Sequence, residues 1–102
     1  MRRAAKIDGN QETIVYALRQ LGASVQSLAA VGSGVPDLLV GYRGACLLFE
    51  IKDPSQKPSH QRLTPAQEKW HREWKGHVVV VRYASEAVAE LERVLGPKVI
   101  PF

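Results

Sequence analysis

Residues 35–52 read VPDLLVGYRGACLLFEIK, and this stretch sets the architecture of the chain. Two apolar runs flank Arg43-Gly44, which predicts two antiparallel strands joined by a tight turn. Both runs are apolar at successive positions, so each strand presents apolar side chains on both faces, as strands in the centre of a sheet do. Acidic residues stand where the first strand begins and where the second one ends, at Asp37 and Glu50.

The register of this hairpin predicts a cluster of charges. If Tyr42 pairs with Ala45 across a two-residue turn, Asp37 lies opposite Glu50, with Cβ atoms about 5 Å apart. Side chains alternate along a strand, so Lys52 shares a face with Glu50. Two carboxylates this close repel each other unless a cation sits between them.

The chemistry of this cluster suits the hydrolysis of a phosphodiester. Mg²⁺ prefers oxygen ligands and commonly binds beside a phosphate substrate. A lysine next to the ion would hold the scissile phosphate or orient and deprotonate a water. The alternative is a hairpin that ends in solvated charges with a surface ion pair, because a short E-x-K pattern occurs often by chance.

Three motifs together resemble the virus-type replication-repair nuclease (VRR-NUC) family of the PD-(D/E)xK superfamily. They are GVPDLL at 34–39, FEIK at 49–52 and LTPAQ at 63–67. The resemblance spans about residues 10 to 85. It implies an α/β restriction-endonuclease-like core, in which a central mixed β-sheet is flanked by helices.

The resemblance also implies a fuller site. Family members carry an acid in the first helix, and Glu12 is the position that matches; the alternative is that Glu12 only favours the helix dipole. The glutamine of the TPxQ motif belongs to the active site of the family. The expected cofactor is Mg²⁺, with Mn²⁺ as a possible substitute. The predicted catalytic residues are Asp37, Glu50, Lys52, Gln67 and Glu12, and the predicted metal ligands are Asp37, Glu50, Glu12 and the carbonyl of Ile51.

Apolar spacing predicts helices over 10–21, 65–75 and 86–95, and strands over 23–30 and 77–83. The strand of four consecutive valines, 78–81, is expected to be buried and parallel to the Glu50 strand, because a right-handed crossover joins them. Helix starts are predicted at Asp8 with Gln11 or at Asn10, at Thr64-Pro65 with Gln67 in a capping box, and at Ser85. Residues expected to face the core are Ile14, Ala17, Leu18 and Leu21 in the first helix and Ala87, Leu91, Val94 and Leu95 in the last.

The middle helix carries a row of side chains with open roles. Gln67, Trp70, His71 and Trp74 share one face by their spacing. We expect both tryptophans in the core, with base stacking as the alternative. His71 either contacts the site or a phosphate, or is a half-buried histidine without a role.

A basic loop follows the charged cluster directly. Residues 53–62 read DPSQKPSHQR and hold no acid after Asp53, so the loop is placed to contact a nucleic-acid backbone; the alternative is a solvated loop. Gly32-Ser33-Gly34 allows positive φ and close approach of a partner's backbone, or forms a plain turn. The predicted DNA-binding residues are Lys57, His60, Arg62, Ser33 and Gly34.

The whole sequence fits one domain, residues 1–102, with an anionic partner. The formal net charge is +4, and no apolar stretch of spanning length or signal-peptide pattern is present, so nucleic acid is favoured over a membrane and an intracellular setting is expected. Cys46 lies in an apolar strand and is expected to be a small core residue. The histidines and this cysteine lack the spacing of a zinc site.

These observations converge on a Mg²⁺-dependent, structure-selective endodeoxyribonuclease. The resemblance implies cleavage of branched DNA, including four-way (Holliday) junctions, and a homodimer whose interface is expected at the first helix or at the final helix and tail. Two alternatives stand beside it. One is a non-catalytic nucleic-acid-binding protein that keeps the scaffold. The other is a sequence-specific restriction-type endonuclease, for which the chain has little room to add a recognition domain.

Overall fold

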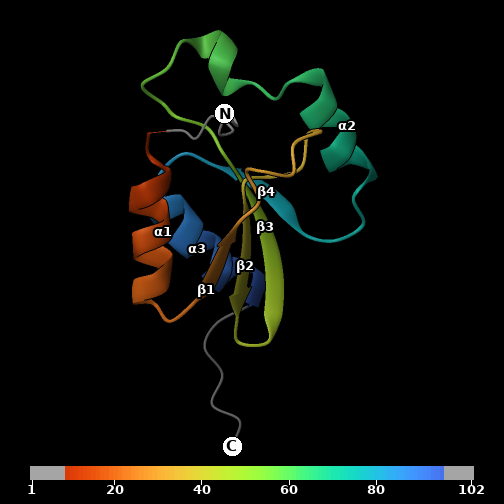
Figure 1. Cartoon of the computed structure of the whole chain (residues 1–102). Coiled ribbons are helices and arrows are strands. Elements are labelled where there is room, and N and C mark those ends of the chain that lie inside the picture. Colours follow the sequence, from red (N-terminus) through yellow and green to blue (C-terminus); the bar gives the residue numbers. More distant parts are fainter. Residues whose placement is uncertain (1–8, 96–102) are drawn as a thin grey trace, which may run out of the picture.

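Four strands in the described part of the chain form one mixed sheet in the order β1-β2-β3-β4, with three α-helices around it (Figure 1). The structure is a computed structural model that describes residues 9–95. A central mixed β-sheet flanked by helices is the α/β architecture that the resemblance implies. The elements are α1 (Gln11–Gln20), β1 (Ser24–Ser27), β2 (Leu38–Tyr42), β3 (Ala45–Ile51), the 3₁₀ turn η1 (Pro58–Gln61), α2 (Pro65–Glu73), β4 (Val78–Val81) and α3 (Ala84–Leu95).

The central hairpin has the predicted register. Tyr42 pairs with Ala45, and Leu39 pairs with Leu48. Arg43 and Gly44 both adopt positive φ, at 52° and 81°, as a two-residue hairpin turn with the twist of its strands requires. β4 pairs parallel to β3, so the predicted crossover from the Glu50 strand is confirmed.

One face of the sheet holds the core. α1 and α3 lie side by side across it (Figure 1). Ile14 and Leu18 of α1 are buried there as predicted, whereas Leu21 is 39% exposed because α1 has already ended at Gln20. Ala17 is half-buried. The buried core of the sheet and α3 consists of Leu38, Val40, Leu47, Phe49, Ile51, Val81, Ala87 and Leu91.

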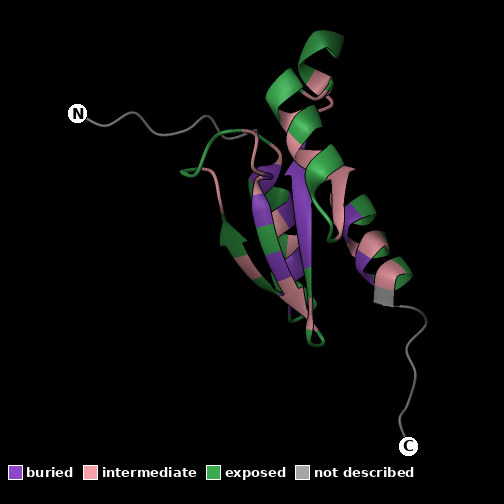
Figure 2. Cartoon of the chain, turned by 90° about the vertical axis from the view of Figure 1, so that its right-hand side faces the viewer, coloured by how far each residue is buried: buried purple, intermediate pink, exposed green. Residues whose placement is uncertain are grey.

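Among residues 9–95, α2 is the helix that covers the opposite face of the sheet, and it covers one end of it. The apolar residues of this face are more exposed than the sequence predicts (Figure 2). Cys46 is exposed and Trp74 is 45% exposed, so their expected core placement is wrong. Trp70 is half-buried and stacks on Trp74, with ring centroids 4.6 Å apart. Only Val81 of the β4 valines is buried, because β4 is an edge strand.

The helix starts follow the predictions in part. Thr64 and Gln67 form the predicted capping box of α2. At α3 the cap is not Ser85: the Glu86 carboxylate accepts hydrogen bonds from the backbone N–H groups of Arg82 and Tyr83. Asp8, the side chain of Leu95 and residues 96–102 lie outside the described part of the chain. Among residues 9–95, every helix is too short or too polar to cross a membrane.

Candidate active site

Asp37 is fixed to the end of β3 by a hydrogen bond. It precedes β2 directly, and its Oδ2 accepts the backbone N–H of Ile51 at 2.7 Å. The ladder of β2 and β3 ends at Leu38 and Phe49, so the same register continued by one residue sets Asp37 opposite Glu50. The structure therefore brings the two acids of the predicted pair to one end of the central hairpin.

Glu50 and Lys52 are held by the same side chain of α2. The Nε2 of Gln67 donates to Glu50 Oε2 at 3.1 Å, and its Oε1 accepts from Lys52 Nζ at 2.9 Å. An amide suits this place because it offers a donor to the carboxylate and an acceptor to the ammonium. Glu50 and Lys52 are buried, at 1% and 7% exposure. A solvated surface ion pair, the alternative interpretation of the E-x-K pattern, is therefore not what this structure contains.

Gln67 is itself positioned by the start of α2. Its Oε1 also accepts the backbone N–H of Thr64 at 2.9 Å, and its own N–H donates to Thr64 Oγ1 at 3.2 Å. The capping box thus fixes both the helix start and the rotamer of the glutamine. A sequence pattern that reads as a helix start serves the site at the same time.

His71 joins the site one helical turn after Gln67. Its Nε2 lies 3.3 Å from Glu50 Oε1. The pKa of His71 is held below its ordinary value, first by burial and then by the positive charge of Lys52. Because an ionised carboxylate can only accept, the Nε2 atom of His71 is the donor in this contact. The spacing of four residues from Gln67 was the sequence signal for this contact.

Gly34 lets the loop before Asp37 pack against α2. Its φ is +83°, and a Cβ atom there would come within 2.5 Å of the Ala66 carbonyl oxygen. The close approach predicted for the glycine loop is therefore made to the chain's own helix. A DNA contact by Ser33, whose φ is also positive at 59°, or by Gly34 stays a prediction.

The first turn of α1 is tied to the same end of the sheet. Asn10 does not cap the helix with its side chain; its Nδ2 donates to the carbonyl oxygens of Lys52 at 3.2 Å and Arg82 at 2.7 Å. Gln11 follows and is buried, and its Oε1 has no hydrogen-bond partner among the described residues. Glu12 is exposed and lines a cavity with Gln11 and Leu38, so its place in the site stays a prediction.

Gln11 is the inward-facing polar residue that the sequence analysis missed. It lies three residues before Ile14 and seven before Leu18, the two buried apolar residues of α1. That spacing was the available signal, because residues three and seven apart share a helix face. The focus on acidic residues favoured its neighbour Glu12 instead.

The donor set fits a hard cation that needs few protein ligands. Asp37 and Glu50 offer carboxylate oxygens at the same end of the central hairpin. Residues 9–95 contain no group of three His, Cys, Asp or Glu side chains placed to hold a metal. Mg²⁺ typically keeps several waters and takes one or two carboxylates together with substrate phosphates.

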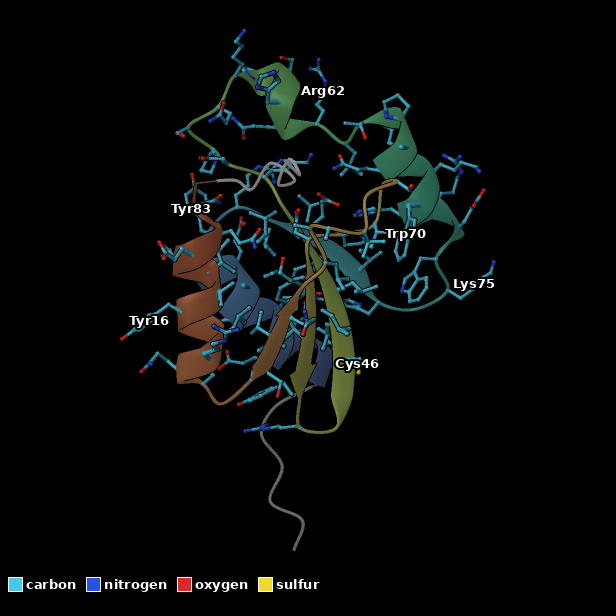
Figure 3. The ribbon with its side chains drawn as sticks, viewed as in Figure 1. Tyr16, Cys46, Arg62, Trp70, Lys75 and Tyr83 are labelled. Atoms are coloured by element: carbon cyan, nitrogen blue, oxygen red, sulfur yellow. The ribbon has the colours of Figure 1, made fainter. Side chains whose placement is uncertain are left out.

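The basic loop lies beyond the site on the α2 side of the molecule. Lys57, His60 and Arg62 are all exposed. Figure 3 shows Arg62 next to η1, at the opposite end of the molecule from the turn that joins β2 and β3. Asp53 fixes the start of this loop. Its Oδ1 accepts from the backbone N–H and the hydroxyl of Ser55, and these hydrogen bonds, the backbone one first, lower the pKa of the Asp53 carboxyl.

Of three comparisons with known proteins, the comparison with solved structures finds a match. No family model matches the chain, and no curated protein matches it. A solved structure described as a VRR_NUC domain is similar, with a TM-score of 0.59 and 31% sequence identity. The match covers 80% of this chain and 89% of that one. It therefore includes most of the sheet and site region described above.

Proposed function

The chain belongs to the VRR-NUC family of nucleases, and on that premise we propose that it is a Mg²⁺-dependent endonuclease that hydrolyses phosphodiester bonds in branched DNA. The observation that carries the proposal is the buried Glu50–Gln67–Lys52 arrangement beside Asp37. Burying a carboxylate and an ammonium is costly. A protein that only binds nucleic acid gains nothing from that cost, so this arrangement favours catalysis.

Each residue of the site has a chemical task in this proposal. Asp37, Glu50 and the carbonyl of Ile51 hold the Mg²⁺ ion, for which Mn²⁺ would substitute. When bound, the ion polarises a phosphoryl oxygen and lowers the pKa of a coordinated water. Lys52 positions the attacking water and offers its charge to the phosphate. Gln67 holds the side chains of Lys52 and Glu50 at fixed positions relative to each other through its two hydrogen bonds.

A panel of labelled DNA substrates tests the function directly. Linear duplex, flap and four-way-junction DNA are incubated with the protein and Mg²⁺, Mn²⁺ or a chelator. We expect cleavage of the branched substrates with either metal and none with the chelator. Failure to cut any substrate contradicts the nuclease assignment for this chain. Equal cleavage of linear duplex contradicts only the preference for branched DNA.

The basic loop is the proposed path of the DNA backbone. Replacing Lys57 and Arg62 together with glutamine is expected to weaken binding and to lower the slope of log affinity against log salt by about 1–2 units. Each cation that neutralises one phosphate releases about one counterion. The measurement is fluorescence anisotropy with junction DNA over a series of salt concentrations.

A matched control removes two cations from the other end of the sheet. Arg19 and Arg43 are both exposed and lie at the end of α1 and in the hairpin turn. Replacing these two with glutamine removes the same charge but should leave the salt slope as it is in the wild type. If the two double variants lower the slope equally, the DNA path is not set by the loop.

We also propose that the protein acts as a homodimer. Resolving a four-way junction needs two symmetric cuts, and a two-fold dimer supplies two sites with that symmetry. The sequence favoured the first helix or the final helix and tail as the interface. In the described structure α1 and α3 pack against each other and against β1 and β4, and an interface on their outer sides stays a prediction. The open sheet face is a second candidate, because Leu39 and Trp74 are 37% and 45% exposed there.

Sedimentation equilibrium tests the assembly. The wild type is expected to sediment as two chains at micromolar concentration, and Leu39→Lys as one chain of about 11.3 kDa. A charge on the buried side of an interface would lack a partner, which opposes association. A wild-type mass of one chain, at concentrations where both strands of a junction are cut, contradicts the dimer.

A further inference from the structure

Helix α2 meets the sheet through polar side chains near its start and through two tryptophans near its end. Among the described residues 65–73 of α2, none is buried. Its polar side chains Gln67 and His71 make hydrogen bonds toward Glu50, and Ala66 approaches Gly34. Trp70 and Trp74 line an apolar cavity with Leu39 and Leu48 of the sheet. Among the described residues, none of α2 belongs to the buried core cluster. Its polar face is therefore better explained by the site that it covers.

Two side chains of α2 contact the Glu50 carboxylate, each at a different oxygen. Gln67 contacts Oε2 at 3.1 Å and His71 contacts Oε1 at 3.3 Å. The side chain of Glu50 is 2% exposed and that of His71 is 13% exposed, so water has little access to this contact. A carboxylate held at both oxygens, by donors one helical turn apart, is restricted in its rotation about χ3. Gln67 alone would fix one oxygen only.

We propose that His71 is a positioning residue for Glu50, which it orients through the hydrogen bond from its imidazole Nε2. The proposal rests on the proposed function, because the orientation matters for holding a cation. A lysine or arginine at this place would cancel the carboxylate charge that attracts the ion. A single N–H donor fixes one oxygen of the carboxylate and leaves further lone pairs of the two oxygens available. Partners of this kind orient metal ligands in other sites.

Two substitutions at His71 separate the hydrogen bond from the bulk of the ring. His71→Phe keeps a flat ring and removes the donor, whereas His71→Gln keeps an uncharged N–H donor. Mn²⁺ binding is measured by calorimetry without DNA, and kcat and KM are measured with junction DNA. For His71→Phe we expect Mn²⁺ affinity and kcat to fall about 10–100-fold, with KM for DNA unchanged. For His71→Gln we expect the Mn²⁺ affinity and kcat to lie much closer to the wild-type values.

His77 provides a matched control within the same fold. Its Nε2 lies 2.7 Å from Glu90 Oε2, between the start of β4 and α3. His77→Phe also breaks a histidine–glutamate contact, but it should leave Mn²⁺ affinity and kcat at wild-type values. Thermal unfolding shows whether each variant folds. If His71→Phe does not fold, His71→Ala takes its place, and the comparison with His71→Gln is unchanged.

The outcomes separate this proposal from the proposed function. Wild-type Mn²⁺ affinity and kcat in the folded donor-less variant overturn the role of His71. So does a loss in His71→Gln as large as the loss in His71→Phe, because then the ring and not its donor is required. If Glu50→Gln loses the nuclease activity, the proposed function is supported even when one of these two results overturns the role of His71. Full activity in Glu50→Gln removes the proposed function itself.

Discussion

Replacing Glu50 with glutamine is expected to lower the single-turnover rate of DNA cleavage by about 10²–10³, which is typical for the loss of one electrostatic contact to the transition state. Glutamine has the same shape but no negative charge, so it cannot attract the metal ion in the way that the proposed mechanism requires. Glu50 is buried at the end of β3 and hydrogen-bonded to Gln67 and His71. A neutral side chain fits the same space, and the fold should persist.

DNA affinity in this variant should stay close to that of the wild type. The expected backbone contacts lie in the loop around η1 and do not involve Glu50. Anisotropy with the chelator present measures binding without turnover. Glu73→Gln serves as the control, because Glu73 lies at the exposed end of α2 and pairs weakly with Lys69 at 4.0 Å. Cleavage by Glu50→Gln at the rate of this control would contradict the assigned site.

The sequence predicts the hairpin and its end because local geometry sets them. A two-residue turn at Arg43-Gly44 fixes the register, and the alternation of side chains then decides which residues share a face. The position of Asp37 opposite Glu50 follows from that register alone. The start of α2 is equally local, because the capping box uses residues three apart in the chain. These parts of the site needed no knowledge of the tertiary structure.

The residues that were predicted wrongly depend on which face of the sheet the helices cover. Cys46 and Trp74 are as apolar in pattern as buried residues, but α1 and α3 both pack on the other face. No local signal tells on which side a helix will lie. The contact between His71 and Glu50, one of two alternatives left open by the sequence, also depends on tertiary structure, since it requires α2 to be docked at one position over β3.

Gly34 controls that docking. The loop that leads into Asp37 passes so close to α2 that only a hydrogen fits between them: a Cβ at residue 34 would lie 2.5 Å from the Ala66 carbonyl oxygen and 3.1 Å from the backbone nitrogen of Gln67. Neither atom can rotate away, because both belong to the helix backbone. An added methyl group must therefore push the first turn of α2, and Gln67 with it, away from Glu50 and Lys52.

The variant Gly34→Ala is accordingly expected to fold less stably and to lose about 10²-fold in cleavage rate, the cost of a misplacement of about 1 Å at a catalytic site. Gly32→Ala is the matched control. Gly32 also has a positive φ, +73°, but a Cβ there would meet nothing within 4 Å. Alanine pays a backbone strain of about 1–2 kcal/mol at either glycine. Only Gly34→Ala should also displace α2. Urea unfolding measures the loss of stability in each variant, and single-turnover cleavage measures the loss of activity separately. Equal losses of activity in the two variants would show that strain, and not the position of α2, limits the site.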